Sequence, residues 1–155
     1  MKRITKNLSM LIILALSFTA CQEDQQKKQI KELQEMFNTT MKETVAIHDE
    51  VMPKMSEISK LQSELEEQSP KMNEEEYQRA NDELARSYQE MMTWMKEFSN
   101  NFDSKEVNSG ITTEDIDELK SKNETLNSLK ASAEEMRDQM EKSLKYAYKL
   151  KERYQ

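Results

Sequence analysis

The residues best suited to chemistry in this sequence are methionines that lie near the single histidine. Methionine accounts for 12 of the 155 residues, and several recur at helical spacing in two stretches. These stretches contain Met41, His48, Met52 and Met55, and then Met91, Met92, Trp94 and Met95. Thioether sulfur and imidazole nitrogen are soft ligands that suit Cu(I). One hypothesis is therefore a periplasmic or surface site for Cu(I) or Ag(I), which a tryptophan would shield. Its candidate ligands are His48, Met52, Met91 and Met95.

The same pattern also has a structural interpretation. Methionine is flexible, fills irregular gaps in a narrow core and packs well against aromatic rings. In that case His48 is a residue at the edge of the core, bonded to water or to a nearby carboxylate. Trp94 lies off the centre of its apolar stripe, so the sequence predicts a half-buried packing residue there. The sequence leaves both interpretations open.

The usual catalytic groups are missing from the sequence. It has one histidine, one cysteine and one glycine, so it lacks the residues for nucleophilic triads and for phosphate-binding loops. Acidic residues are abundant, but a catalytic carboxylate pair needs a pocket that separates the two pKa values. The sequence therefore predicts that the protein is not an enzyme and that it holds no cofactor other than a covalent lipid, for which the argument follows.

The only cysteine, Cys21, follows a segment typical of exported proteins. Residues 1–7 are basic, and Leu8–Leu16 is an apolar run too short to span a bilayer, which takes about 20 residues. The next residues are Phe18, Thr19, Ala20 and Cys21. They resemble the lipobox of bacterial lipoproteins, although Phe18 stands where leucine is usual. The resemblance implies removal of residues 1–20 and lipidation of Cys21. The alternative is a soluble secreted protein with a free thiol.

The residues after Cys21 bear on location. Gln22–Gln26 contains two acidic residues, and the run resembles the surface-export signal of Bacteroidota lipoproteins. A solvated tether over residues 21–26 is the alternative. We expect a lipid-anchored protein of the cell envelope, at the outer membrane, with the leaflet open. The net charge of −7 makes nucleic acid an unlikely partner, whereas an envelope protein is a candidate partner.

Composition predicts an all-α fold in residues 21–155, as a single domain. One glycine and two prolines cannot supply the turns of a β-sandwich, and charged residues make up 34% of the chain. Apolar residues recur every seven positions, which is typical of packed helices. We expect an antiparallel three-helix bundle with coiled-coil-like hairpins. Its helices are predicted at residues 24–68, with a kink at Pro53, and at 70–101 and 113–153. For the second helix, Ser69 and Pro70 indicate the start at residue 70, and Asn73 with Glu76 three residues on is a competing capping-box start. Residues 102–113 are predicted to be a loop, and the oligomeric state stays open.

Two further features complete the prediction. A basic and aromatic C-terminal end differs from the acidic body, and it is either helix-end electrostatics or a docking tip. The candidate tip residues are Tyr146, Lys149, Arg153 and Tyr154. Residues 47–55 and 91–95 resemble segments of small helical Bacteroidota lipoproteins that are often labelled viral A-type inclusion proteins. That resemblance implies a helical lipoprotein and no particular activity.

Overall fold

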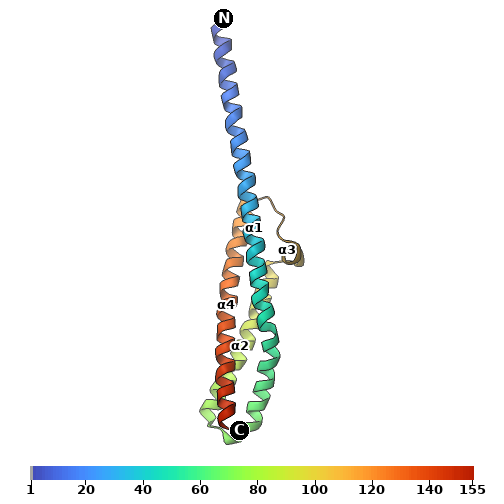
Figure 1. The fold of residues 1–155 in the computed structure, drawn as a ribbon, viewed down its shortest axis with the longest axis vertical. Helices are drawn as coiled ribbons and strands as arrows, with labels where there is room; N and C mark the ends of the chain where they lie inside the picture. The colour runs from blue at the N-terminus through green and yellow to red at the C-terminus, as the bar shows by residue number, and fades with distance from the viewer. Residues whose placement is uncertain (1) are drawn as a thin grey trace.

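A computed structural model describes the backbone of residues 2–155 and the side chains of residues 23–155. In this part of the chain all regular structure is helical, which confirms the predicted all-α fold. The long helices are α1 (Lys2–Gln68), α2 (Glu74–Asn101) and α4 (Ile116–Arg153), and α3 (Ser104–Ser109) is short. The molecule is a rod, in which α1 continues well beyond the other helices toward the N-terminus (Figure 1).

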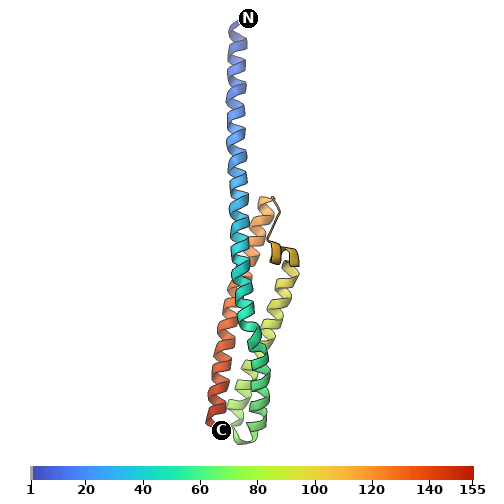
Figure 2. The ribbon, with the colours of Figure 1, turned by 45° about the vertical axis from the view of Figure 1, so that its right-hand side comes forward.

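The three long helices run down, up and down along the rod in the view of Figure 1. α1 and α4 are parallel, and α2 is antiparallel to both (Figure 1; Figure 2). α4 packs extensively on α1 and on α2, whereas α1 and α2 share few contacts with each other. α4 is therefore the central helix, and the predicted α1–α2 hairpin is held together mainly through it.

The α1–α4 interface is a parallel seam with a seven-residue repeat. The rows that follow this repeat are fully buried: on α1 they are Phe37, Thr44, Val51, Ile58 and Leu65, and on α4 they are Leu119, Leu126, Ala133, Met140 and Ala147. A strict repeat of seven keeps the same face toward the partner helix over several turns. The one hydroxyl in the α1 row, that of Thr44, donates to the carbonyl of Thr40 at 2.7 Å and so is satisfied. Pro53 lies on the exposed side of α1, as predicted.

Ion pairs mark one register along this seam. Lys54 contacts Glu141 at 2.6 Å, and Lys151 contacts Glu64 at 2.6 Å; in both pairs the partners are 87 residues apart. Lys130 and Glu43, at 2.8 Å, have the same offset. Such pairs near the surface contribute only about 0–1 kcal/mol each, so they select the register more than they stabilise the fold.

Small residues bring α2 close to α4. Ala80 and Ser87 on α2 are fully buried, as are Ser143 and Ala147 on α4. The hydroxyls of Ser87 and Ser143 are 2.8 Å apart, and each also reaches a carbonyl of its own helix. This buried polar pair is satisfied on both sides, so the interface tolerates it.

The start of α2 is not at residue 70 but at the competing capping-box position predicted from Asn73 and Glu76. Ser69–Lys71 form a 3-10 turn, and α2 starts at Glu74 instead of residue 70. Asn73 is the cap, because its side chain accepts from the amide of Glu76 at 3.1 Å. The amide of Asn73 donates to the hydroxyl of Tyr154, which lies 3.3 Å from the Glu76 carboxylate. In a capping box, the side chain of Glu76 would accept from the Asn73 amide. Here the hydroxyl of Tyr154, near the C-terminus, accepts from that amide instead.

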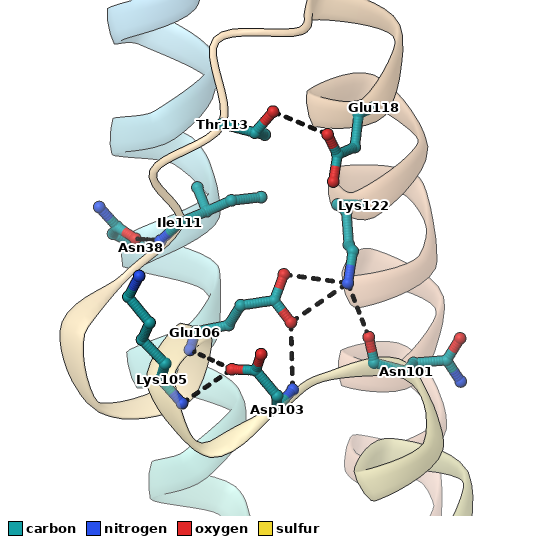
Figure 3. A network of polar contacts seen from close by, with 9 residues as sticks. All are labelled: Asn38, Asn101, Asp103, Lys105, Glu106, Ile111, Thr113, Glu118 and Lys122. Atoms are coloured by element: carbon teal, nitrogen blue, oxygen red, sulfur yellow. Dashed lines mark hydrogen bonds and ion pairs between the residues drawn. The ribbon is translucent and has the colours of Figure 1, made fainter.

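The segment predicted as a loop, residues 102–113, contains α3. Asp103 caps it and forms a capping box with Glu106. Lys122 of α4 contacts Glu106 at 2.9 Å and donates to the carbonyl of Asn101 (Figure 3). α3 ends at Gly110, which has a φ of 84° that favours glycine. A Cβ there would lie 2.5 Å from Oδ1 of Asn38, which accepts from the amide of Ile111.

Two helix starts also differ from the prediction. α4 begins at Ile116 with Asp115 as its cap, not at residue 113, because the Asp115 carboxylate accepts from two amides of the first turn. α1 begins at Lys2, not at residue 24, so residues 21–26 are part of this helix. The side chains of residues 1–20 and of Cys21 lie outside the described residues.

Asn123 is the one polar side chain of α4 that faces α1 at a central position. It is buried, and its amide nitrogen donates to the carbonyls of Leu119 and Leu33, at 2.8 and 3.1 Å. Its Oδ1 atom is buried with no partner. A buried unpaired acceptor costs about 1–3 kcal/mol, whereas the bond to α1 favours this register.

Asn123→Leu should therefore stabilise the fold. Removal of the unpaired oxygen outweighs the loss of the hydrogen bonds. We expect the free energy of unfolding to rise by about 1 kcal/mol, which raises the Tm measured by circular dichroism by roughly 2–4 °C. Asn127→Leu, at an exposed position one turn along the same helix, is the control and should change little. A clear drop in Tm for Asn123→Leu would show that the cross-helix bond outweighs the unpaired acceptor.

Candidate functional site

An apolar groove lies between α1 and α2, with α3 at one end. Its volume is about 650 Å³. It is lined by Val45, His48 and Asp49 of α1, by Met92, Trp94, Met95, Lys96, Phe98 and Ser99 of α2, and by Val107 of α3. This volume falls within the range of small-ligand sites, and a few polar groups at an apolar surface are typical of them.

The groove exists because α1 and α2 diverge. Both helices pack on α4, and they have few contacts with each other. α1 bends where its colour passes from cyan to green, in the stretch that contains Pro53, and α2 leans away on the other side (Figure 2). Proline removes a backbone hydrogen bond and kinks a helix in this way. The side chains of the opened section line a depression instead of a packed seam.

Trp94 forms the floor of the groove. The sequence predicted a half-buried residue, but Trp94 is buried, and its indole nitrogen donates to the carbonyl of Leu129 on α4 at 2.9 Å. Its ring stacks with that of Phe98, at a centroid distance of 5.1 Å. Phe98 in turn contacts Phe102, which packs edge-on against Phe37 of α1. The indole is therefore fixed by a hydrogen bond and by an aromatic row that joins α2 to α1.

His48 is at the rim of the groove, above Trp94. The imidazole and indole rings stack with centroids 6.0 Å apart, and the His48 side chain is 30% exposed. Its Nδ1 lies 3.0 Å from Oδ1 of Asp49. Because an ionised carboxylate only accepts hydrogen bonds, this contact places a proton on Nδ1. In the neutral ring Nε2 then has a free lone pair.

The four candidate metal ligands do not all meet. His48 and Met95 line the groove, together with Met92, which is 43% exposed. Met91 is fully buried in the core, and Met52 is 39% exposed and is not among the lining residues. The core-packing interpretation fits Met41, Met55, Met91, Met136 and Met140, all of which are buried. Among the residues that the structure describes, no three histidine, cysteine, aspartate or glutamate side chains form a metal-binding group.

The candidate C-terminal tip makes contacts within the chain. Arg153 donates to Glu76 at 2.9 Å, and Tyr154 packs into the cap of α2 described above. The Arg79 guanidinium lies 5.0 Å from the centre of the Tyr146 ring. These three tip residues close the end of the bundle. Tyr146, Arg153 and Lys149 also line a shallow, open depression at this end.

A second depression, of about 720 Å³, runs between α2 and α4 on the other side of Trp94. Its lining includes acidic, basic and amide side chains, among them Arg86, Glu90, Glu135 and Lys142. Charges of both signs with open access to water are what a solvated helix interface presents. The residues that line this depression therefore indicate no particular class of ligand.

At the other end of the rod, residues 23–29 of α1 form an arm that continues from the bundle toward Cys21. Residues 23–29 are all exposed, and α4 begins beside the section that follows them. Ion pairs between residues four apart run along the arm: Glu23–Lys27, Lys28–Glu32 and Lys31–Glu35. The hydrogen bond from Lys27 also lowers the pKa of Glu23. Pairs at this spacing support a helix that has no packing partner.

Comparison with known proteins adds no relative. No family model, no curated protein and no solved structure matches this chain. In the part of the chain that the structure describes, no helix is long and apolar enough to cross a membrane.

Trp94→Phe should weaken the bundle measurably. The phenyl ring keeps the stacking but loses the hydrogen bond to Leu129 and leaves a small cavity, so we expect a loss of about 1–3 kcal/mol in urea denaturation. Tyr88→Phe is the matched control, because Tyr88 is exposed on the same helix and should be neutral. Equal stability of the two variants would contradict the role of the indole hydrogen bond.

Tyr148 should titrate at unusually high pH. Its hydroxyl donates to Glu57 at 2.7 Å, and this hydrogen bond, with partial burial and the negative charge, raises its pKa from 10.0 to about 12. The neutral phenol is favoured in the folded protein. The stabilisation is therefore complete below pH 10 and disappears as the pH rises through 12.

Glu57→Ala removes the acceptor and the charge, and it should return the pKa of Tyr148 toward its ordinary value. Ultraviolet absorbance of tyrosinate measures this titration. Glu67→Ala, at an exposed position further along α1, serves as the control and should leave the titration unchanged. An unchanged curve for Glu57→Ala would mean that the two side chains do not interact in solution.

Proposed function

We propose that the protein is a lipid-anchored, non-catalytic helical module of the cell envelope, which presents its bundle to a partner away from the membrane surface. The observation that supports this function best is the exposed arm. Residues 23–29 leave the bundle as a single helix, and that helix leads directly to the lipobox-like Cys21. An anchor at Cys21 would have a ready spacer between the lipid and the packed domain.

The dimensions suit such a spacer. The arm between Cys21 and the start of the α1–α4 seam spans about eight residues, or roughly 12 Å, and the remainder of α1 adds roughly 60 Å. The bundle tip and the C-terminus are at the far end of the rod (Figure 1). With the lipid at one end, the α1–α2 groove would lie partway along the rod and open sideways to a partner in the envelope.

The lining of the groove is consistent with a surface that binds a partner. The groove has one imidazole, one carboxylate and one ammonium group, and its wall is otherwise mainly apolar. Such a surface suits binding more than proton transfer, which needs a matched acid and base near a reacting atom.

The anchor is tested by metabolic labelling with an alkyne analogue of palmitate in a bacterial host. The full chain should take up label and partition into the detergent phase, and Cys21→Ser should lose both properties. Ser17→Ala, which leaves the Phe18–Cys21 stretch intact, is the control and should be labelled normally. Label that persists in Cys21→Ser, or a mature chain without lipid, would overturn the proposed anchor.

A further inference from the structure

The methionines whose side chains the structure describes are either packed in the core or lie wholly or partly at the surface. Five are buried and fill the core. Met92 is 43% exposed, and together with the half-buried Met95 it lines the groove where the only histidine is located. Exposure alone does not mark a site, since Met36 and Met52 are exposed to a similar degree. What distinguishes Met92 is its position beside His48 and Met95 in an apolar groove.

The contacts of His48 orient its imidazole ring and leave Nε2 available to a ligand. The Asp49 carboxylate holds the proton on Nδ1, so that Nε2 has the free lone pair. A histidine that binds metal almost always donates its other ring nitrogen to a carboxylate, a carbonyl or a water, which fixes the tautomer and the ring orientation. The stacking of the ring on the buried Trp94 restricts it further.

The donors around this groove select a particular kind of ion. Thioether sulfur and neutral imidazole nitrogen are soft and uncharged, whereas Mg²⁺ and Ca²⁺ need several oxygen ligands. The charged side chains that line the groove are Asp49 and Lys96, one of each sign, so the wall carries no excess negative charge for a hard dication. Soft donors on an apolar wall fit a monovalent soft ion.

We propose that the groove binds Cu(I) or Ag(I) through Nε2 of His48 and the thioether sulfurs of Met92 and Met95. Trp94 forms the apolar floor below the ion and limits access of water. Compared with the ligand set expected from the sequence, Met92 replaces Met91 and Met52, because Met91 is enclosed in the core and Met52 is outside the groove. This site does not depend on the lipid anchor proposed above.

The test is titration with Ag(I) of the full chain carrying Cys21→Ser, so that no thiol competes. Trp94 is the only tryptophan, so its fluorescence reports on the groove, and isothermal titration gives the stoichiometry. We expect one tightly bound ion per chain and a change in Trp94 emission. His48→Gln, Met92→Leu and Met95→Leu should each weaken binding about tenfold or more.

Met36→Leu and Met52→Leu are the matched controls, because both residues are exposed methionines outside the groove. They should bind Ag(I) like the parent chain. Circular dichroism without metal checks that each variant remains folded. The proposal is overturned by weak binding of several ions with the affinity of free methionine, by groove variants that bind like the parent, or by a loss of affinity in Met52→Leu equal to that in Met92→Leu.

Discussion

The rest of the structure depends on the parallel packing of α4 against α1. Parallel helices cannot be joined by a short turn, so the chain has to return along the rod before α4 begins. α2 supplies most of that return path, and α3 with its flanking loop supplies the remainder. The seven-residue rows on α1 and α4 therefore determine the seam. Because this seam is parallel, a shorter antiparallel helix, α2, has to come between α1 and α4 in the sequence. Asn123 and the ion pairs with an offset of 87 residues mark one register of this seam.

The groove follows from the same arrangement. A helix that packs mainly on a third helix is free to diverge from its neighbour in sequence, and α2 does so from α1. The bend near Pro53 increases the separation, and the row formed by Trp94, Phe98 and Phe102 closes the bottom of the space with rigid rings. Rigid aromatic walls and a hydrogen-bonded indole keep the depression open, where flexible side chains alone would fill it. The groove is thus a product of helix geometry, with His48 at its rim.

Much of the fold was predictable from sequence because the buried rows have a strict period. Residues such as Phe37, Val51 and Ile58 recur every seven positions, and that period indicates a packed helix without any knowledge of the partner. Local capping was harder to predict. Pro70 and the capping pair Asn73 and Glu76 each predict a start for α2, and the structure has the second, with Glu74 as the first helical residue. The contact that completes this cap comes from Tyr154, 81 residues away, which accepts from the Asn73 amide. α3 was missed because six residues are too few to show a helical period.

The candidate site was only partly predictable, for a related reason. Helical spacing identified His48 and the methionines near Trp94, but it could not show which of them face one another across two helices that diverge. Met91 and Met92 are adjacent in sequence, and yet the first is enclosed and the second faces water. Trp94 was expected to be half-buried because it lies off the centre of its apolar stripe. It is buried, and its indole donates to the carbonyl of Leu129 on another helix, a contact that no spacing within α2 could show. Each of these outcomes depends on how α1 and α2 separate above the bend, which no local pattern encodes.

The central position of α4 has a consequence for the order in which the protein folds. The helix that packs most extensively on the others is also the last to be synthesised, and α1 and α2 have little to hold them together before it arrives. α1 and α2 therefore gain most of their packing only when α4 docks on them. For a chain that crosses a membrane as a thread, as the proposed export requires, this delay keeps the polypeptide unfolded during passage. The contact of Tyr154 with the start of α2 is the last to form under that proposal, because it needs the final residues of the chain.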